Sequence, residues 1–86
     1  MGKIFIVCKS ITSAQKIMNI VTKNGFWANI LRTPSEIRLK SCSYSVVFYE
    51  KDLQGIINTL KSRNYPILSL YIKNDGFYQK MEGDFE

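Results

Sequence analysis

The chain has 86 residues, of which 45 % are apolar and 22 % charged, a balance typical of a globular protein and not of a disordered one. This length supports one domain with a modest core, without a second domain or a large enclosed cleft. The formal net charge is +5, and the chain contains two cysteines and no histidine. The lack of histidine removes the usual general base and the commonest metal ligand, which excludes a catalytic triad and an ordinary zinc site. A binding module, a carrier, a structural partner and a single-thiol enzyme remain.

The first half of the chain predicts a strand, a helix and a second strand. Residues 3–8 form a short β-branched and aromatic run, typical of a strand. Hydroxyl side chains then favour a helix start, and apolar residues follow at helical spacing until Asn24-Gly25 ends the helix. Residues 26–31 are strand-like, and Thr33-Pro34 ends that strand because the residue before proline is held extended.

The second half predicts a strand, a helix and a last strand. Residues 44–49 form the first of these, apolar residues at helical spacing cover residues 53–64, and residues 67–72 form the last. Asn74-Asp75-Gly76 is expected to break this strand, and we expect no regular structure after it. We therefore predict one domain at residues 1–73 and an acidic C-terminal tail at residues 74–86, which carries one base against four acids.

The order β-α-β-β-α-β predicts an α+β fold, the ferredoxin-like two-layer sandwich. Its antiparallel sheet has the order 4-1-3-2, with both helices on one face. In this topology the end of the first strand, at Cys8, lies at the same edge as the start of the first helix. The connection at residues 32–43 begins and ends at that edge too. A connection this long in a small domain is often functional.

This edge is predicted to attract anions, because a helix N-terminus presents free N–H groups and several bases lie nearby. Cys42 lies in the connection, and such surroundings lower the pKa of a thiol, so we expect it to be the reactive group. The alternative is a half-buried cysteine without chemistry. Cys8 lies in phase with Ile4 and Ile6, which favours packing over a role as a resolving thiol. The candidate anion-binding residues are Lys9, Ser10, Thr12, Ser13, Arg38 and Lys40; no metal site or cofactor is expected.

Aromatic side chains are expected on the sheet face away from the helices. Phe5, Val7, Trp27, Tyr49 and Tyr71 can share it. The third strand lacks the Lys/Arg-Gly-aromatic pattern of RNA-recognition domains, which argues against a nucleic-acid partner. We expect instead a homodimer through this open face, or a partly covered second core.

No targeting or membrane segment is apparent. The apolar run at residues 4–8 is too short for the core of a signal peptide, and no stretch approaches the roughly 20 apolar residues of a membrane span. We therefore expect a cytoplasmic protein without a membrane partner. Both cysteines are then expected to be free thiols, because the cytoplasm is a reducing compartment.

Three segments resemble a family of small bacterial proteins known as DUF3343, described as selenium/sulfur carrier-like. They are Phe5-Ile-Val-Cys-Lys-Ser10, Arg32-Thr-Pro-Ser-Glu-Ile37 and Ser41-Cys42-Ser43, within a resemblance that covers roughly residues 3 to 73. The family pattern has Arg where this chain has Ser35, Gly where it has Ser43, and an aromatic residue where it has Cys8.

The resemblance and the edge argument together lead to a functional hypothesis. Cys42 holds sulfur or selenium, Lys9, Arg38 and Lys40 with the helix start stabilise its charge, and Thr33, Pro34 and Glu36 shape the connection. The protein is then a carrier or thiol partner of sulfur- or selenium-transfer proteins, and not an enzyme in its own right. The alternative is a non-catalytic regulatory or interaction domain that binds a small anion or a protein partner.

Overall fold

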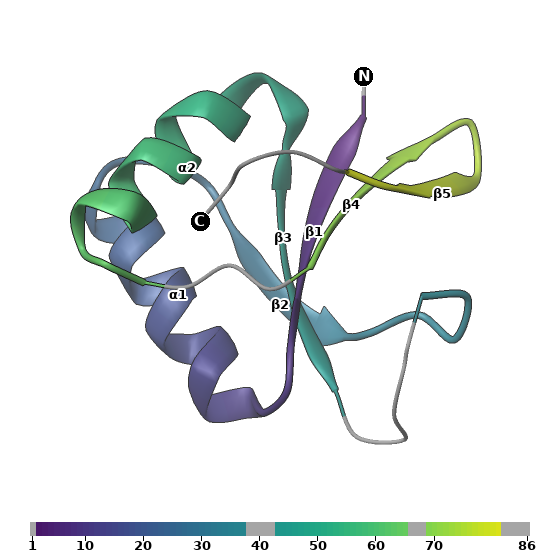
Figure 1. Cartoon of the computed structure of the whole chain (residues 1–86), viewed down its shortest axis with the longest axis horizontal. Coiled ribbons are helices and arrows are strands. Elements are labelled where there is room, and N and C mark those ends of the chain that lie inside the picture. Colours follow the sequence, from purple (N-terminus) through teal and green to yellow (C-terminus); the bar gives the residue numbers. More distant parts are fainter. Residues whose placement is uncertain (1, 38–42, 66–68, 82–86) are drawn as a thin grey trace.

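The computed structural model describes residues 2–37, 43–65 and 69–81 (Figure 1). These residues form five strands, two helices and a short 3-10 turn. In order, the elements are β1 (Lys3–Cys8), α1 (Ile11–Lys23), β2 (Asn29–Arg32), β3 (Tyr44–Tyr49), the 3-10 turn η1 (Glu50–Asp52), α2 (Leu53–Ser62), β4 (Leu70–Asn74) and β5 (Phe77–Lys80).

The strands form one antiparallel sheet in the order β2-β3-β1-β4-β5, and both helices lie on the same side of it (Figure 1). The protein is therefore a mixed α+β fold. The sheet order differs from the predicted four-stranded 4-1-3-2 because a fifth strand, β5, pairs with β4 beyond the predicted edge.

The prediction of no regular structure after residue 76 is wrong for Phe77–Lys80, which form β5. The backbone φ angles of Asp75 and Gly76 are 53° and 84°. Two successive positive φ angles form the tight turn whose twist matches an antiparallel hairpin, so Asp-Gly joins two strands here instead of ending one. Residues 82–86 of the predicted acidic tail lie outside the described residues.

The first helix has the predicted limits because residues near its two ends set them locally. The Ser10 hydroxyl accepts a hydrogen bond from the Ser13 N–H at 3.2 Å, which caps the start. At the other end Asn24 is the C-cap. Gly25 follows with a φ of 89°, a backbone angle that residues with a side chain rarely adopt. The second helix is shorter than predicted, since Asn64 has a φ of 55° and lies outside it.

The second strand begins later than predicted, at Asn29 and not at residue 26. Phe26 lies instead against α2, where a Cβ added to Gly55 would stand only 2.7 Å from its ring. Trp27 stacks on Tyr49, the last residue of β3. Packing of these two aromatic side chains thus takes precedence over strand pairing at residues 26–28.

The main core lies between the helices and the sheet face that they cover. Apolar residues at alternate strand positions meet the buried stripe of each helix there. The buried members are Ile4, Ile6, Cys8, Ala14, Ile17, Val21, Val46, Phe48, Ile56, Ile57, Leu60 and Leu70.

A second, smaller cluster lies on the opposite face of the sheet, here called the far face. Phe5 and Val47 project there from β1 and β3, and Ile37 from the 33–43 connection covers them. Tyr78 of β5 meets the Phe5 ring edge-on, with 5.4 Å between ring centroids. This part of the far face is therefore a partly covered second core, the second of the two expectations for it. The homodimer stays a prediction.

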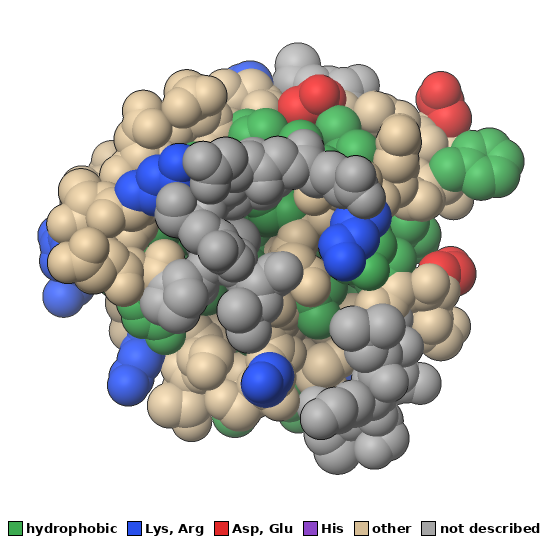
Figure 2. All heavy atoms as spheres, viewed as in Figure 1, with side chains coloured by type: hydrophobic (Ala, Val, Ile, Leu, Met, Phe, Trp, Pro, Cys, Tyr) green, Lys and Arg blue, Asp and Glu red, His purple; other side chains and the backbone are tan. Residues whose placement is uncertain are grey.

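Two further features concern the surface. In residues 2–37, 43–65 and 69–81, neither helix has the length and apolar character to cross a membrane. In the space-filling view, basic side chains are spread over the molecule, at the left, below and to the right of the centre, whereas acidic ones lie toward its top and right (Figure 2).

Candidate functional site

The end of β1, the end of β2, the start of β3 and the start of α1 meet at one edge of the molecule, here called the α1 edge. Strand register places Cys8 opposite Tyr44, and Tyr44 opposite Arg32. Ser10, the N-cap of α1, follows Cys8 by two residues. The structure thus brings together the elements that the topology argument placed at this edge, at the lower end of Figure 1.

Three hydroxyl side chains lie at the start of α1: those of the N-cap Ser10 and of Thr12 and Ser13 in the first turn. This turn contains no acidic residue. Ser10 donates to the Ser13 hydroxyl at 3.3 Å, and its oxygen accepts from the Ser13 N–H. Thr12 and Lys9 are exposed beside them. Because the first turn has no carboxylate of its own to neutralise the positive end of the helix, this turn is suited to attract an anion from solution. Lys9, Ser10, Thr12 and Ser13 therefore lie together as predicted, and their role in binding stays a prediction.

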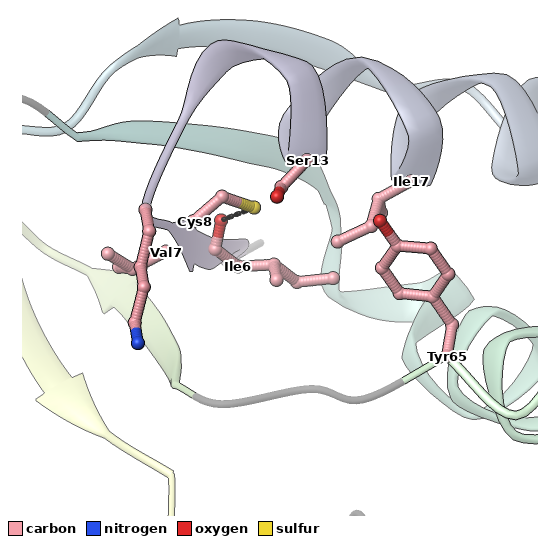
Figure 3. A pocket seen from close by; sticks show the side chains of 7 residues that line it. Ile6, Val7, Cys8, Ser13, Ile17 and Tyr65 are labelled. Carbon is pink, nitrogen blue, oxygen red and sulfur yellow. Dashed lines mark hydrogen bonds between the residues drawn. The ribbon is translucent and has the colours of Figure 1, made fainter.

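A pocket of about 230 Å³ lies between the end of β1 and the start of α1 (Figure 3). Its walls are mostly apolar, and polar groups come from the Cys8 thiol, the Ser13 hydroxyl, the Tyr65 phenol and Lys9. In Figure 3 the thiol and the Ser13 hydroxyl point toward each other. The lining residues are Ile6, Val7, Cys8, Lys9, Ser13, Ile17 and Tyr65.

Cys8 is a packing residue with a neutral thiol. Its side chain is only 6 % exposed and belongs to the main core, and the thiol donates to the Ile6 carbonyl with 3.6 Å between sulfur and oxygen. Burial raises the pKa of the Cys8 thiol from 9.0 to about 11, because the thiolate loses its hydration there. The thiolate is the nucleophilic form, so Cys8 is poorly suited to exchange chemistry near neutral pH.

The 33–43 connection is fixed at both ends. The Thr33 N–H donates to the Ser43 carbonyl at 3.2 Å, which ties the first residue of the connection to the last. The Ile37 N–H donates to the Pro34 carbonyl at 3.1 Å and closes a turn, and the Ile37 side chain is buried on the far face. Glu36 is exposed, and its carboxylate accepts from the Ser35 hydroxyl at 3.2 Å.

Under this connection lies a pair of buried hydroxyl groups. The Thr33 and Ser45 side-chain oxygens are 2.8 Å apart, and both residues are buried. The Ser43 hydroxyl is also buried and has no hydrogen-bond partner among the residues that the structure describes. Ser45 alternates with Val46 of the main core, so this pair lies on the far face while the start of α1 lies on the helix face. Thr33, one of the predicted loop-shaping residues, thus shares an edge but not a face with the predicted anion-binding residues at the start of α1.

Three predicted site residues, Arg38, Lys40 and Cys42, lie outside the described residues. Ser43, which follows Cys42 in the sequence, lies at the α1 edge through its bond to Thr33. In the described part of the chain, no group of three or more His, Cys, Asp or Glu side chains is placed to hold a metal ion.

Sequence reasoning missed two contributors to this edge. Ser45 is a hydroxyl residue inside an otherwise apolar or aromatic strand, and that break in the pattern was a signal of a buried polar contact. Tyr65 lines the pocket from the segment after α2. Its position depends on tertiary packing, and no local sequence pattern predicts it.

The fold and the α1 edge together describe a small α+β protein in which the two ends of a long connection lie beside a helix N-terminus. Comparison with family models matches residues 3–72 to the family described as "Putative Se/S carrier protein-like", and the chain belongs to this family. This agrees with the resemblance seen in the sequence. No match was found among curated proteins or among solved structures.

Proposed function

We propose that the protein is a sulfur or selenium carrier, or a thiol partner in such transfer, and that Cys42 is the carrying thiol. The observation that carries this proposal is membership of the carrier-like family over residues 3–72. Cys42 and Cys8 are the two cysteines of the chain, and the neutral, buried thiol of Cys8 is the less suited of the two.

The surroundings of the 33–43 connection support the proposal. The connection begins and ends at the α1 edge, where the first turn of α1 lacks an acid and Lys9 is exposed. Positive potential at this edge favours a thiolate or a persulfide anion over its protonated form. Arg38 and Lys40 add charge in the sequence next to Cys42, and Thr33, Pro34 and Glu36 shape the connection.

The proposed transfer is an exchange between a thiolate and a persulfide. The Cys42 thiolate attacks the terminal sulfur of a donor persulfide, a new sulfur–sulfur bond forms on Cys42, and the donor leaves as a thiolate. The terminal sulfur and its proton move together, so no external oxidant or reductant is needed. A selenium analogue follows the same balance.

Three further expectations belong to the same proposal. The six elements from β1 to β4 are assigned to the ferredoxin-like class, with β5 as an addition. A homodimer through the part of the far face away from Lys3 and Lys73 is retained as a proposal. A cytoplasmic location suits the chemistry, because a carrier thiol has to stay reduced between transfers.

The test measures alkylation rate against pH by intact mass, on wild type, Cys8→Ser and Cys42→Ser. We expect a midpoint for Cys42 well below the ordinary value of about 8.5 and little labelling in Cys42→Ser near neutral pH. Incubation with a cysteine desulfurase and cysteine should then add one sulfur atom to Cys8→Ser but not to Cys42→Ser. An ordinary midpoint together with no sulfur adduct would refute the proposal.

The alternative is a non-catalytic domain that binds a small anion or a protein partner at the α1 edge. The acid-free first turn of α1 and the adjoining pocket are the observations that favour it. In that case Cys42→Ser keeps full binding, whereas reversing the charges of Arg38 and Lys40 abolishes it.

A further inference from the structure

A row of aromatic and lysine side chains crosses the far face of the sheet at the end opposite the α1 edge. Strand register places Tyr49 of β3 beside Lys3 of β1, Lys3 beside Lys73 of β4, and Lys73 beside Tyr78 of β5. Trp27 extends the row past Tyr49, because the two rings are stacked with centroids 4.8 Å apart and planes 28° from parallel. These five residues are here called the aromatic-lysine row.

The Trp27–Tyr49 stack is open to solvent. Trp27 is 46 % exposed, and one face of its indole lies against Tyr49. An exposed large aromatic group of this kind often marks a binding surface. Its position is fixed in advance, since stacking on a residue at the end of a strand holds the ring.

Cations accompany the rings. The Lys51 ammonium lies 5.8 Å from the centroid of Tyr49, and the Lys73 ammonium 5.2 Å from that of Tyr78. Lys3 and Lys73 are direct cross-strand neighbours, an arrangement of like charges that is unfavourable unless an anion lies between them. No acidic residue occurs in the five described strands, and within the described residues no ion pair engages Lys3, Lys51 or Lys73.

We propose that the aromatic-lysine row binds single-stranded nucleic acid. Bases stack on Trp27 and Tyr49, and phosphates lie along Lys3, Lys51 and Lys73. Stacking platforms flanked by cations bind single strands with little sequence preference, because every base has a π face. Neighbouring strands lie about 4.8 Å apart, so the row spans about 14 Å from Tyr49 to Tyr78, enough for a few nucleotides.

A polyanion fits this row better than a protein partner does. An apolar protein surface would desolvate Lys3 and Lys73 side by side without neutralising them, and interface cores are depleted in lysine for this reason. The pattern of RNA-recognition domains, absent from β3, concerns stacking within the sheet strands. Here the stack is made by Trp27, which precedes β2, and by the last residue of β3.

The test uses Trp27 as its own probe, since it is the single tryptophan of the chain. Ten-nucleotide U and dT strands are titrated into the full chain at low salt, with tryptophan emission and the anisotropy of a dye-labelled strand as readouts. We expect quenching of Trp27 together with binding. The binding constant should fall with salt with a log–log slope of about −2, as three phosphate contacts predict for a single strand.

Matched variants decide whether the row is responsible, with circular dichroism as a check on folding. Trp27→Ala should weaken binding of the labelled strand at least about fivefold, whereas Phe77→Ala, an exposed aromatic outside the row, should not. The double variant Lys3→Gln/Lys73→Gln should reduce the slope to about −0.7, and Lys16→Gln/Arg63→Gln, two exposed residues with the same change of charge, should leave it near −2.

Three results would overturn the proposal. The first is absence of quenching and of anisotropy change in low salt. The second is binding that is lost in Lys9→Gln/Lys16→Gln but kept in Trp27→Ala, which would place nucleic acid at the α1 edge. The third is Trp27 emission that changes with protein concentration alone, with a dimer by sedimentation, which would show that a second copy occupies the row.

Discussion

The buried hydroxyl pair beneath the 33–43 connection gives the sharpest test of the packing described here. Thr33→Val keeps the shape of the side chain but removes its hydroxyl, and the Ser45 hydroxyl, 2.8 Å away and buried, is left without a partner. An unpaired buried hydroxyl costs about 1–3 kcal/mol. We therefore expect Thr33→Val to lower the free energy of unfolding by about 1–3 kcal/mol, and Ser45→Ala to do the same by leaving Thr33 unpaired.

The double variant separates the hydrogen bond from the loss of polar atoms. Removing both hydroxyls leaves no unpaired polar group. Thr33→Val/Ser45→Ala should therefore lower the free energy of unfolding by less than the sum of the two single changes, by about 1 kcal/mol or more. Ser43→Ala is the matched control, because the Ser43 hydroxyl is also buried but has no hydrogen-bond partner in the described part of the chain. It should leave stability unchanged or raise it slightly.

The assay is urea unfolding followed by the emission of Trp27, with equal m values required across the set. Two outcomes would refute the reasoning. One is additivity of the two single changes within about 0.5 kcal/mol, which would mean that the hydroxyls do not interact. The other is a loss in Ser43→Ala as large as in Thr33→Val, which would mean that Ser43 also has a partner.

Two further predictions concern Cys8 and the hairpin turn. The pKa of the Cys8 thiol is raised from 9.0 to about 11 in the folded protein, so the folded state holds this proton more tightly than the unfolded chain. The contribution of the protonated thiol to the free energy of unfolding is therefore complete below pH 9 and is lost as pH rises through 11. Between those values wild type should lose about 1.4 kcal/mol per pH unit relative to Cys8→Ala in urea unfolding, and parallel pH profiles would contradict this. Gly76→Ala should lower stability by about 1 kcal/mol, since the φ of Gly76 is 84°, while Asp75→Asn should be neutral because Asn tolerates positive φ; thermal unfolding of the three proteins checks this.

The elements that the sequence predicts well are those whose limits depend on neighbouring residues. The first helix begins after Ser10 because that hydroxyl bonds the Ser13 N–H, and it ends before Gly25 because only glycine readily adopts that backbone. Both signals are local, so no knowledge of the rest of the fold is needed to use them. The family resemblance is likewise carried by short contiguous segments.

The errors arise where local signals admit two outcomes. Asp75-Gly76 reads as a strand terminator or as a hairpin turn, and the choice depends on whether the following residues find a partner strand. Here Phe77–Lys80 pair with β4, and Tyr78 packs on Phe5. Similarly, Phe26 and Trp27 have high strand propensity, but Phe26 packs at Gly55 and Trp27 stacks on Tyr49, and neither residue pairs in the sheet.

For the candidate site, topology predicted the meeting of Cys8, Ser10 and the ends of the connection at one edge, since strand order and direction determine which ends coincide. It did not predict the faces. The Thr33–Ser45 pair lies on the far face, and this depends on the register between β2 and β3, which a shift of one residue would reverse. The role of Cys42 is a proposal, because the residue lies outside the described part of the structure.

The two proposed surfaces lie at opposite ends of β1, and this makes them separable. Lys3 in the aromatic-lysine row and Cys8 at the α1 edge are the first and last residues of that strand, about 17 Å apart along an extended chain. The row is on the far face, and the start of α1 is on the helix face. At physiological ionic strength the Debye length is about 8 Å, so charge changes at one surface are largely screened at the other. Loss of nucleic-acid binding in row variants therefore bears on the row alone, and loss of sulfur loading in Cys42→Ser bears on the carrier site alone.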